Sequence, residues 1–70
     1  MGMDHLSARL RTLRESKWPL LSQRKTSELC GLPKNALQKY ERGEAIPTAE
    51  VLLKLADYYG VSVDYLLGRE

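Results

Sequence analysis

The sequence predicts an all-α fold in which five short helices form one compact domain, residues 1–70. Four of the five helical segments end at a glycine, the residue that most readily adopts the positive φ found after a helix C-terminus. These glycines are Gly31, Gly43, Gly60 and Gly68. The chain has no phenylalanine while 43% of its residues are hydrophobic. The core is therefore expected to consist mainly of leucine, packed tightly in so small a domain.

The first expected helix begins at about Asp4, a residue that can cap it. Its apolar stripe contains Leu6, Leu10 and Leu13, and its flanks carry Arg9, Arg11 and Arg14. This spacing predicts a helix with one buried side and one strongly basic side. Residues 1–3, Met-Gly-Met, are interpreted as a disordered or added start without a function.

Residues 22–43 are SQRKTSELCGLPKNALQKYERG, and they predict two short helices joined by a tight turn. Ser22 can cap the first helix by accepting a hydrogen bond from a backbone N–H, and Gly31 ends it. Pro33 is expected to restart the helix at once, because its fixed φ and missing N–H suit a first helical turn. Leu32, held extended by the proline, is expected to point inward between the two helices.

The second helix of this segment has two faces of different chemistry. Ala36, Leu37 and Tyr40 form an apolar side, and Gly43 closes the helix. Four polar or basic residues lie on the other side: Lys34, Asn35, Gln38 and Lys39. A packed helix followed by a polar, basic second helix is typical of a helix-turn-helix that binds DNA.

The last two expected helices complete the core. One follows Pro47 with Thr48 as its cap, and its apolar face contains Val51, Leu52, Leu55, Ala56 and Tyr59. The other is short, follows a Ser62 cap, and contains Val63, Leu66 and Leu67. Residues 60–63 alone could also form a strand, but the chain offers no partner strand, which favours the helix.

Charge is distributed unevenly along the chain. Residues 1–42 contain nine Lys or Arg and four Asp or Glu, a balance of +5, whereas residues 43–70 contain two and five, a balance of −3. On charge alone, a solvated basic face is the commoner explanation. Because the basic half coincides with the helix-turn-helix segment, we favour a surface that meets phosphates.

Three segments resemble the Cro/C1-type helix-turn-helix family, which includes the lambdoid repressors. They are Leu6-x-x-Arg9-Leu10-Arg11-x-Leu13-Arg14, Leu21-Ser22-Gln23 through Tyr40-Glu41-Arg42-Gly43, and Pro47-Thr48 through Leu66-Leu67-Gly68. The resemblance covers residues 6–68. It implies a five-helix lambda-repressor-like domain that binds double-stranded operator DNA as a homodimer and regulates transcription, usually by repression.

The same resemblance implies roles for individual residues. Lys34, Asn35, Gln38 and Lys39 match the positions that face the major groove, where Asn or Gln can pair with adenine and Lys can reach guanine. Pro33 replaces a usual Ser or Thr, so a hydroxyl cap or contact is lost, although the ring can touch a thymine methyl. The residues expected to contact phosphate are Gln23, Arg42, Arg9, Arg14 and Arg24. Gln23 is also expected to brace the first residue of the recognition helix.

Two departures from the family pattern stand out. Trp18-Pro19-Leu20 resembles a two-residue insertion between the first and second helices. We expect Trp18 and Leu20 to cover the edge of the core, with a dimer or partner contact as the alternative. Thr26-Ser27 replaces the usual Leu-Ala, so Thr26 is expected to bury less apolar surface and the second helix to be less stable.

Other kinds of chemistry are poorly represented, so no enzyme activity, metal or other cofactor is expected. His5 and Cys30 are the only soft ligands and are not paired in sequence, and Cys30 is interpreted as a core residue. Asp57 and Asp64 fit surface or capping positions. Three tyrosines late in the chain could stack on single-stranded bases, but the acidic surroundings favour core or dimer positions: Tyr58, Tyr59 and Tyr65.

The single cysteine and the absence of a long apolar segment predict a cytoplasmic protein without a membrane span. No small-molecule effector site is evident. Two alternatives to a repressor stay open. One is the antitoxin of a toxin–antitoxin pair that regulates its own synthesis, and the other is a protein-interaction module that kept the fold without binding DNA.

Overall fold

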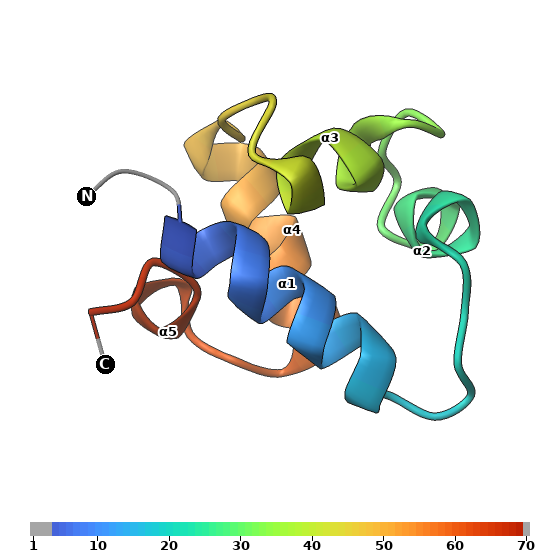
Figure 1. Cartoon of the computed structure of the whole chain (residues 1–70), viewed down its shortest axis with the longest axis horizontal. Coiled ribbons are helices and arrows are strands. Elements are labelled where there is room, and N and C mark those ends of the chain that lie inside the picture. The colour runs from blue at the N-terminus through green and yellow to red at the C-terminus, as the bar shows by residue number, and fades with distance from the viewer. Residues whose placement is uncertain (1–3, 70) are drawn as a thin grey trace.

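The structure, a computed structural model, describes residues 4–69 and contains five helices in that range (Figure 1). They are α1 (Asp4–Ser16), α2 (Gln23–Leu29), α3 (Ala36–Arg42), α4 (Ala49–Tyr59) and α5 (Val63–Leu66). This confirms the predicted all-α fold, with α2 and α3 forming the helix-turn-helix. The predictions for residues 1–3 and for the Asp4 cap lie outside what is described.

Three predicted hydroxyl caps are confirmed. Ser22, Thr48 and Ser62 each accept a hydrogen bond from the backbone N–H three residues on, at 3.0, 3.3 and 2.9 Å. Each bond pairs an N–H that the first turn of a helix leaves without an intrahelical partner. The Ser62 cap leads directly into α5, so the strand alternative for residues 60–63 is excluded. Each of the four glycines has φ between 69° and 78°, as predicted.

The start of α3 differs from the prediction. Pro33 does not restart the helix at once; instead the N–H of Ala36 donates to the Pro33 carbonyl at 3.0 Å, and α3 begins at Ala36. Asn35 has φ −103° and ψ 7°, which are close to the values of the third residue in a type I turn. The chain therefore makes one tight turn before the helix, and Lys34 and Asn35 belong to that turn.

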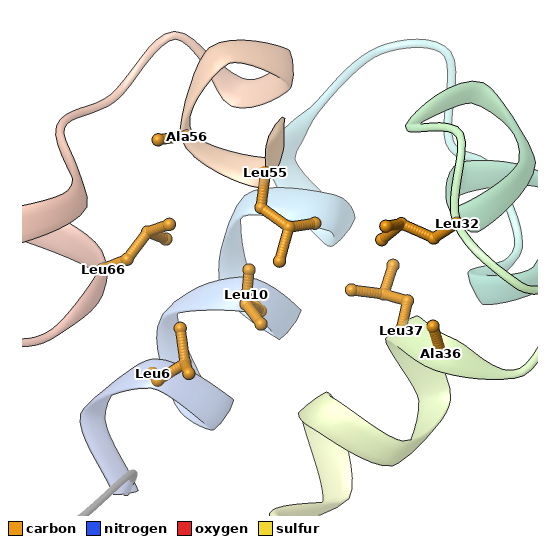
Figure 2. Packing of buried hydrophobic residues seen from close by; sticks show 8 residues of the cluster. All are labelled: Leu6, Leu10, Leu32, Ala36, Leu37, Leu55, Ala56 and Leu66. Carbon is orange, nitrogen blue, oxygen red and sulfur yellow. The ribbon is translucent and has the colours of Figure 1, made fainter. Parts of the chain in front are cut away.

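Leucine side chains from α1, α3, α4, α5 and the turn before α3 meet in the core (Figure 2). Leu6 and Leu10 of α1 face Leu55 of α4 and Leu66 of α5, all with 1% exposure or less. Leu32, Ala36, Leu37 and Ala56 complete the buried cluster. Leu32 thus points inward as predicted, and α3 lies against both α1 and α2. The helix expected to contact DNA is anchored on its inner side by this core.

The connection between α1 and α2 does not cover the core. Trp18 is 87% exposed and Leu20 is 62% exposed, so the prediction that they close the edge of the core is wrong. Leu13 already packs against the core at the end of α1, and Leu21 is the half-buried residue of the connection. The connection therefore runs along the outside of the domain (Figure 1). The alternative, that Trp18 and Leu20 contact a dimer partner or another protein, stays a prediction.

Two of the polar residues of α2, Thr26 and Ser27, are buried. Thr26 is 1% exposed and Ser27 is fully buried, and the expectation that Thr26 buries less apolar surface than the usual leucine, leaving α2 less stable, stays a prediction. Cys30 packs against the core as predicted, and burial raises the pKa of its thiol. None of the helices within residues 4–69 has the length and apolar character needed to cross a membrane.

Candidate nucleic-acid interface

The four residues predicted to contact bases lie on two neighbouring pieces of backbone. Lys34 and Asn35 lie in the turn before α3, whereas Gln38 and Lys39 lie in its first turns. Lys34, Asn35 and Lys39 are exposed, and Gln38 is half-buried. Neither lysine forms an ion pair within the described residues. Their charges are therefore available to an anionic ligand.

Three of the four line one hollow of about 500 Å³ beside α3. It is lined by apolar, polar and basic residues: Pro33, Lys34, Asn35, Ala36, Lys39, Tyr40 and Ala45. Gln38 is not part of this lining. A second hollow of about 340 Å³ is lined by Arg24, Glu28, Leu32 and Lys34. Lys34 lines both hollows.

Asn35 occupies the N-cap position of α3, yet its side chain makes no capping hydrogen bond. The Oγ of Ser27, on α2, accepts the hydrogen bond from the backbone N–H of Leu37 at 3.0 Å instead. This N–H belongs to the first turn of α3, where helix donors lack intrahelical partners. The cap of the candidate recognition helix is therefore supplied by the preceding helix.

A buried carboxylate holds two of the predicted phosphate contacts. Glu41 has a fully buried side chain, and it accepts hydrogen bonds from Arg14 Nε at 2.8 Å and Arg14 Nη2 at 3.0 Å. The amide nitrogen of Gln23 donates to the same carboxylate at 2.8 Å. Glu41 raises the pKa of the Arg14 guanidinium by hydrogen bonding, against the smaller opposite effect of burial. These contacts tie α1 and the start of α2 to the last turn of α3.

This arrangement corrects one implied contact and reveals one that sequence reasoning missed. Gln23 braces Glu41 in the last turn of α3, not the first residue of the recognition helix. Glu41 was not among the predicted site residues, although it follows Leu37 by four positions and so lies on the inner face of α3. A charged residue on an apolar face predicts a buried, paired group, and that signal was available in the sequence.

The remaining phosphate candidates differ in what already binds them. Arg9 donates to the carbonyl of Tyr65 and stacks over its ring, 4.2 Å from the centroid. Arg42 forms an exposed ion pair with Glu44 at 3.6 Å. Arg24 is exposed and lines the second hollow, without an ion pair among the described residues. Arg42 and Arg24 are thus the most accessible cations among the predicted phosphate contacts.

The late tyrosines belong to the packing of the C-terminal half. Tyr59 packs against the core as predicted, and burial raises the pKa of its hydroxyl, with the Glu41 charge adding to the effect. Tyr58 packs edge-on against Tyr59 and lies beneath the ammonium of Lys17. A dimer contact by these residues stays a prediction.

Comparison with known proteins agrees with this geometry. A family model described as helix-turn-helix matches residues 10–66. Over 49 residues the chain is 41% identical to the HTH-type transcriptional regulator ImmR of Bacillus subtilis, covering 70% of this chain and 39% of the regulator. It is 40% identical over 48 residues to the cryptic phage CTXphi transcriptional repressor RstR of Vibrio cholerae, covering 69% and 43% of the two chains.

A third relative, the HTH-type transcriptional regulator AnsR of Bacillus subtilis, is 41% identical over 63 residues, which are 89% of this chain and 52% of AnsR. The chain spans about half the length of these curated relatives or less. The chain belongs to the Cro/C1-type helix-turn-helix family.

Proposed function

We propose that this protein binds double-stranded DNA sequence-specifically and regulates transcription, as a repressor, with α3 and the turn before it in the major groove. One observation carries the proposal: Lys34, Asn35 and Lys39 converge on one exposed hollow. Its two lysines suit phosphates and guanine acceptors, and an exposed carboxamide suits adenine. The names of the relatives, two regulators and a phage repressor, support the same function.

Within this proposal, bases are contacted by Lys34, Asn35, Gln38 and Lys39, and phosphates by Arg42 and Arg24. Arg14 and Gln23 already bind Glu41, and Arg9 already binds Tyr65. We therefore assign these three to holding the helices in place, with any phosphate contact secondary. The protein acts in the cytoplasm as a homodimer on a pseudo-palindromic operator whose half-sites lie about 34 Å apart.

Asn35→Ala provides the first test. The variant is expected to lose about 1 to 3 kcal/mol of discrimination at one base pair of the operator, because a bidentate contact to that base disappears. Binding to an operator selected from random DNA would be measured for both proteins, on the operator and on its single-base variants. An equal loss on all sequences would contradict direct recognition of a base by Asn35.

Binding at low salt separates this proposal from a protein-interaction module. Phosphate contacts are strongest there, so wild type should bind even random DNA with measurable affinity. Negligible binding under these conditions would contradict the proposal as a whole.

Glu50 offers a control for the Asn35→Ala test. It is exposed on α4 and lines neither hollow, so Glu50→Ala should leave sequence discrimination unchanged.

A second test concerns the proposed contact between Pro33 and a thymine methyl group, and it changes the DNA instead of the protein. Pro33 is exposed and lines the larger hollow together with Ala36 and Tyr40, and only thymine among the four bases can offer a methyl group there. Replacing that thymine by uracil should weaken binding about threefold to fivefold, as expected for one buried methyl. Equal affinity for uracil at every thymine of the operator would contradict the contact.

A further inference from the structure

Ser27 is a departure from the family pattern whose side chain contacts the start of α3. It stands where Ala is common, and its hydroxyl accepts the hydrogen bond of the Leu37 N–H at 3.0 Å. Both Ser27 and Leu37 are fully buried. The first turn of α3 is thus capped by a hydroxyl from α2.

The source of this cap matters because Asn35 occupies the N-cap position. An asparagine there normally turns its side-chain oxygen onto a backbone N–H of the first helical turn. The oxygen of such a carboxamide already accepts a hydrogen bond from the backbone, so the side chain is held against the helix and cannot turn toward a base. In this protein the Ser27 hydroxyl accepts the hydrogen bond of that turn, and Asn35 is exposed and lines the larger hollow.

We propose that Ser27 is a positioning residue for base recognition: by capping α3 from α2, it keeps the Asn35 carboxamide free to bind a base. The inference rests on the proposed function, because it concerns the residue that function assigns to the base. Removing the Ser27 hydroxyl leaves a buried N–H without an acceptor, which is unfavourable. Asn35, at the N-cap position, has a side chain that can accept this hydrogen bond instead, and capping by Asn35 withdraws its carboxamide from the DNA.

The test is the discrimination between the selected operator and its variant at the base pair that Asn35 contacts. We expect about tenfold discrimination for wild type and less than threefold for Ser27→Ala. In a double variant with Asn35→Ala, discrimination should fall no further, because the carboxamide has already left the base. Affinity for random DNA, which depends on phosphate contacts, should change by less than twofold.

Ser22→Ala is the matched control, because Ser22 caps α2 with a bond of the same length, 3.0 Å to the Lys25 N–H. It should lower stability through the same kind of lost cap and keep the tenfold discrimination. Binding of Ser27→Ala to random DNA within twofold of wild type shows that this variant is folded.

Three outcomes would overturn the inference. They are tenfold discrimination retained by Ser27→Ala, an equal loss in Ser22→Ala, and a further fall in discrimination when Asn35→Ala is added to Ser27→Ala. If wild type itself shows no sequence discrimination, the proposed function fails and the inference fails with it. If wild type discriminates between the two sequences and Ser27→Ala discriminates equally well, the inference fails and the proposed function stands.

Discussion

Replacing Glu41 by alanine is expected to lower the free energy of unfolding by about 3 to 5 kcal/mol, the usual cost of removing one partner of a buried ion pair. The Glu41 side chain is fully buried and binds both Arg14 and Gln23. Its loss leaves the Arg14 side chain, only 16% exposed, without its counterion. A domain of 70 residues has roughly 4 to 10 kcal/mol of stability, so the variant should be close to unfolding.

Glu44→Ala is the matched control. Glu44 also pairs with an arginine, Arg42, at 3.6 Å, but both side chains are more than half exposed. An exposed pair contributes little, so the free energy of unfolding should change by less than about 0.5 kcal/mol. Urea denaturation of the three proteins would measure both effects. Similar losses in the two variants would show that burial does not set the contribution of Glu41.

The double variant Arg14→Met with Glu41→Leu separates stability from DNA contact. Well-packed apolar residues can replace a buried ion pair at little cost, so most of the lost stability should return. The dependence of DNA affinity on salt can then be measured without Arg14. An unchanged slope is expected from the proposed role of Arg14 in holding the helices, whereas a slope smaller by about one would identify a phosphate contact.

The ends of the helices were predictable because their signals are local. Ser22, Thr48 and Ser62 each cap a helix through a bond to the residue three positions on. The start of α3 was not predictable in this way, since Pro33 fits a first helical turn and a β-turn equally well. The hydroxyl that caps α3 comes from Ser27, ten residues before the N–H it binds.

The part of the candidate site that consists of exposed residues was predictable from the sequence. Lys34, Asn35 and Lys39 follow from the outward face of a periodic segment, and they lie together on one hollow. The Arg14–Glu41 pair joins residues 27 positions apart, and local patterning cannot assign such partners. The exposure of Trp18 was not predictable either, because the local sequence does not show whether the core has room for an apolar residue of a connection.

Replacing Leu37 by alanine is expected to lower the free energy of unfolding by about 3 to 4 kcal/mol, within the range for a fully buried leucine. Leu37 has no exposed surface, and its side chain lies among those of Leu10, Leu32 and Leu55 (Figure 2). It is the main apolar anchor of α3. Leu53→Ala is the control, because Leu53 is 58% exposed and its truncation should cost less than about 0.5 kcal/mol.

The same variant distinguishes anchoring of the recognition helix from contact with DNA. Leu37→Ala should weaken operator binding only through its smaller folded fraction, so DNA in excess should restore the folded state. A ligand at 100 times its dissociation constant stabilises by about 2.7 kcal/mol, which offsets most of the expected loss. Thermal unfolding with and without operator would show this recovery, with base discrimination unchanged. If discrimination is lost even at saturation, Leu37 sets the orientation of α3 as well as its stability.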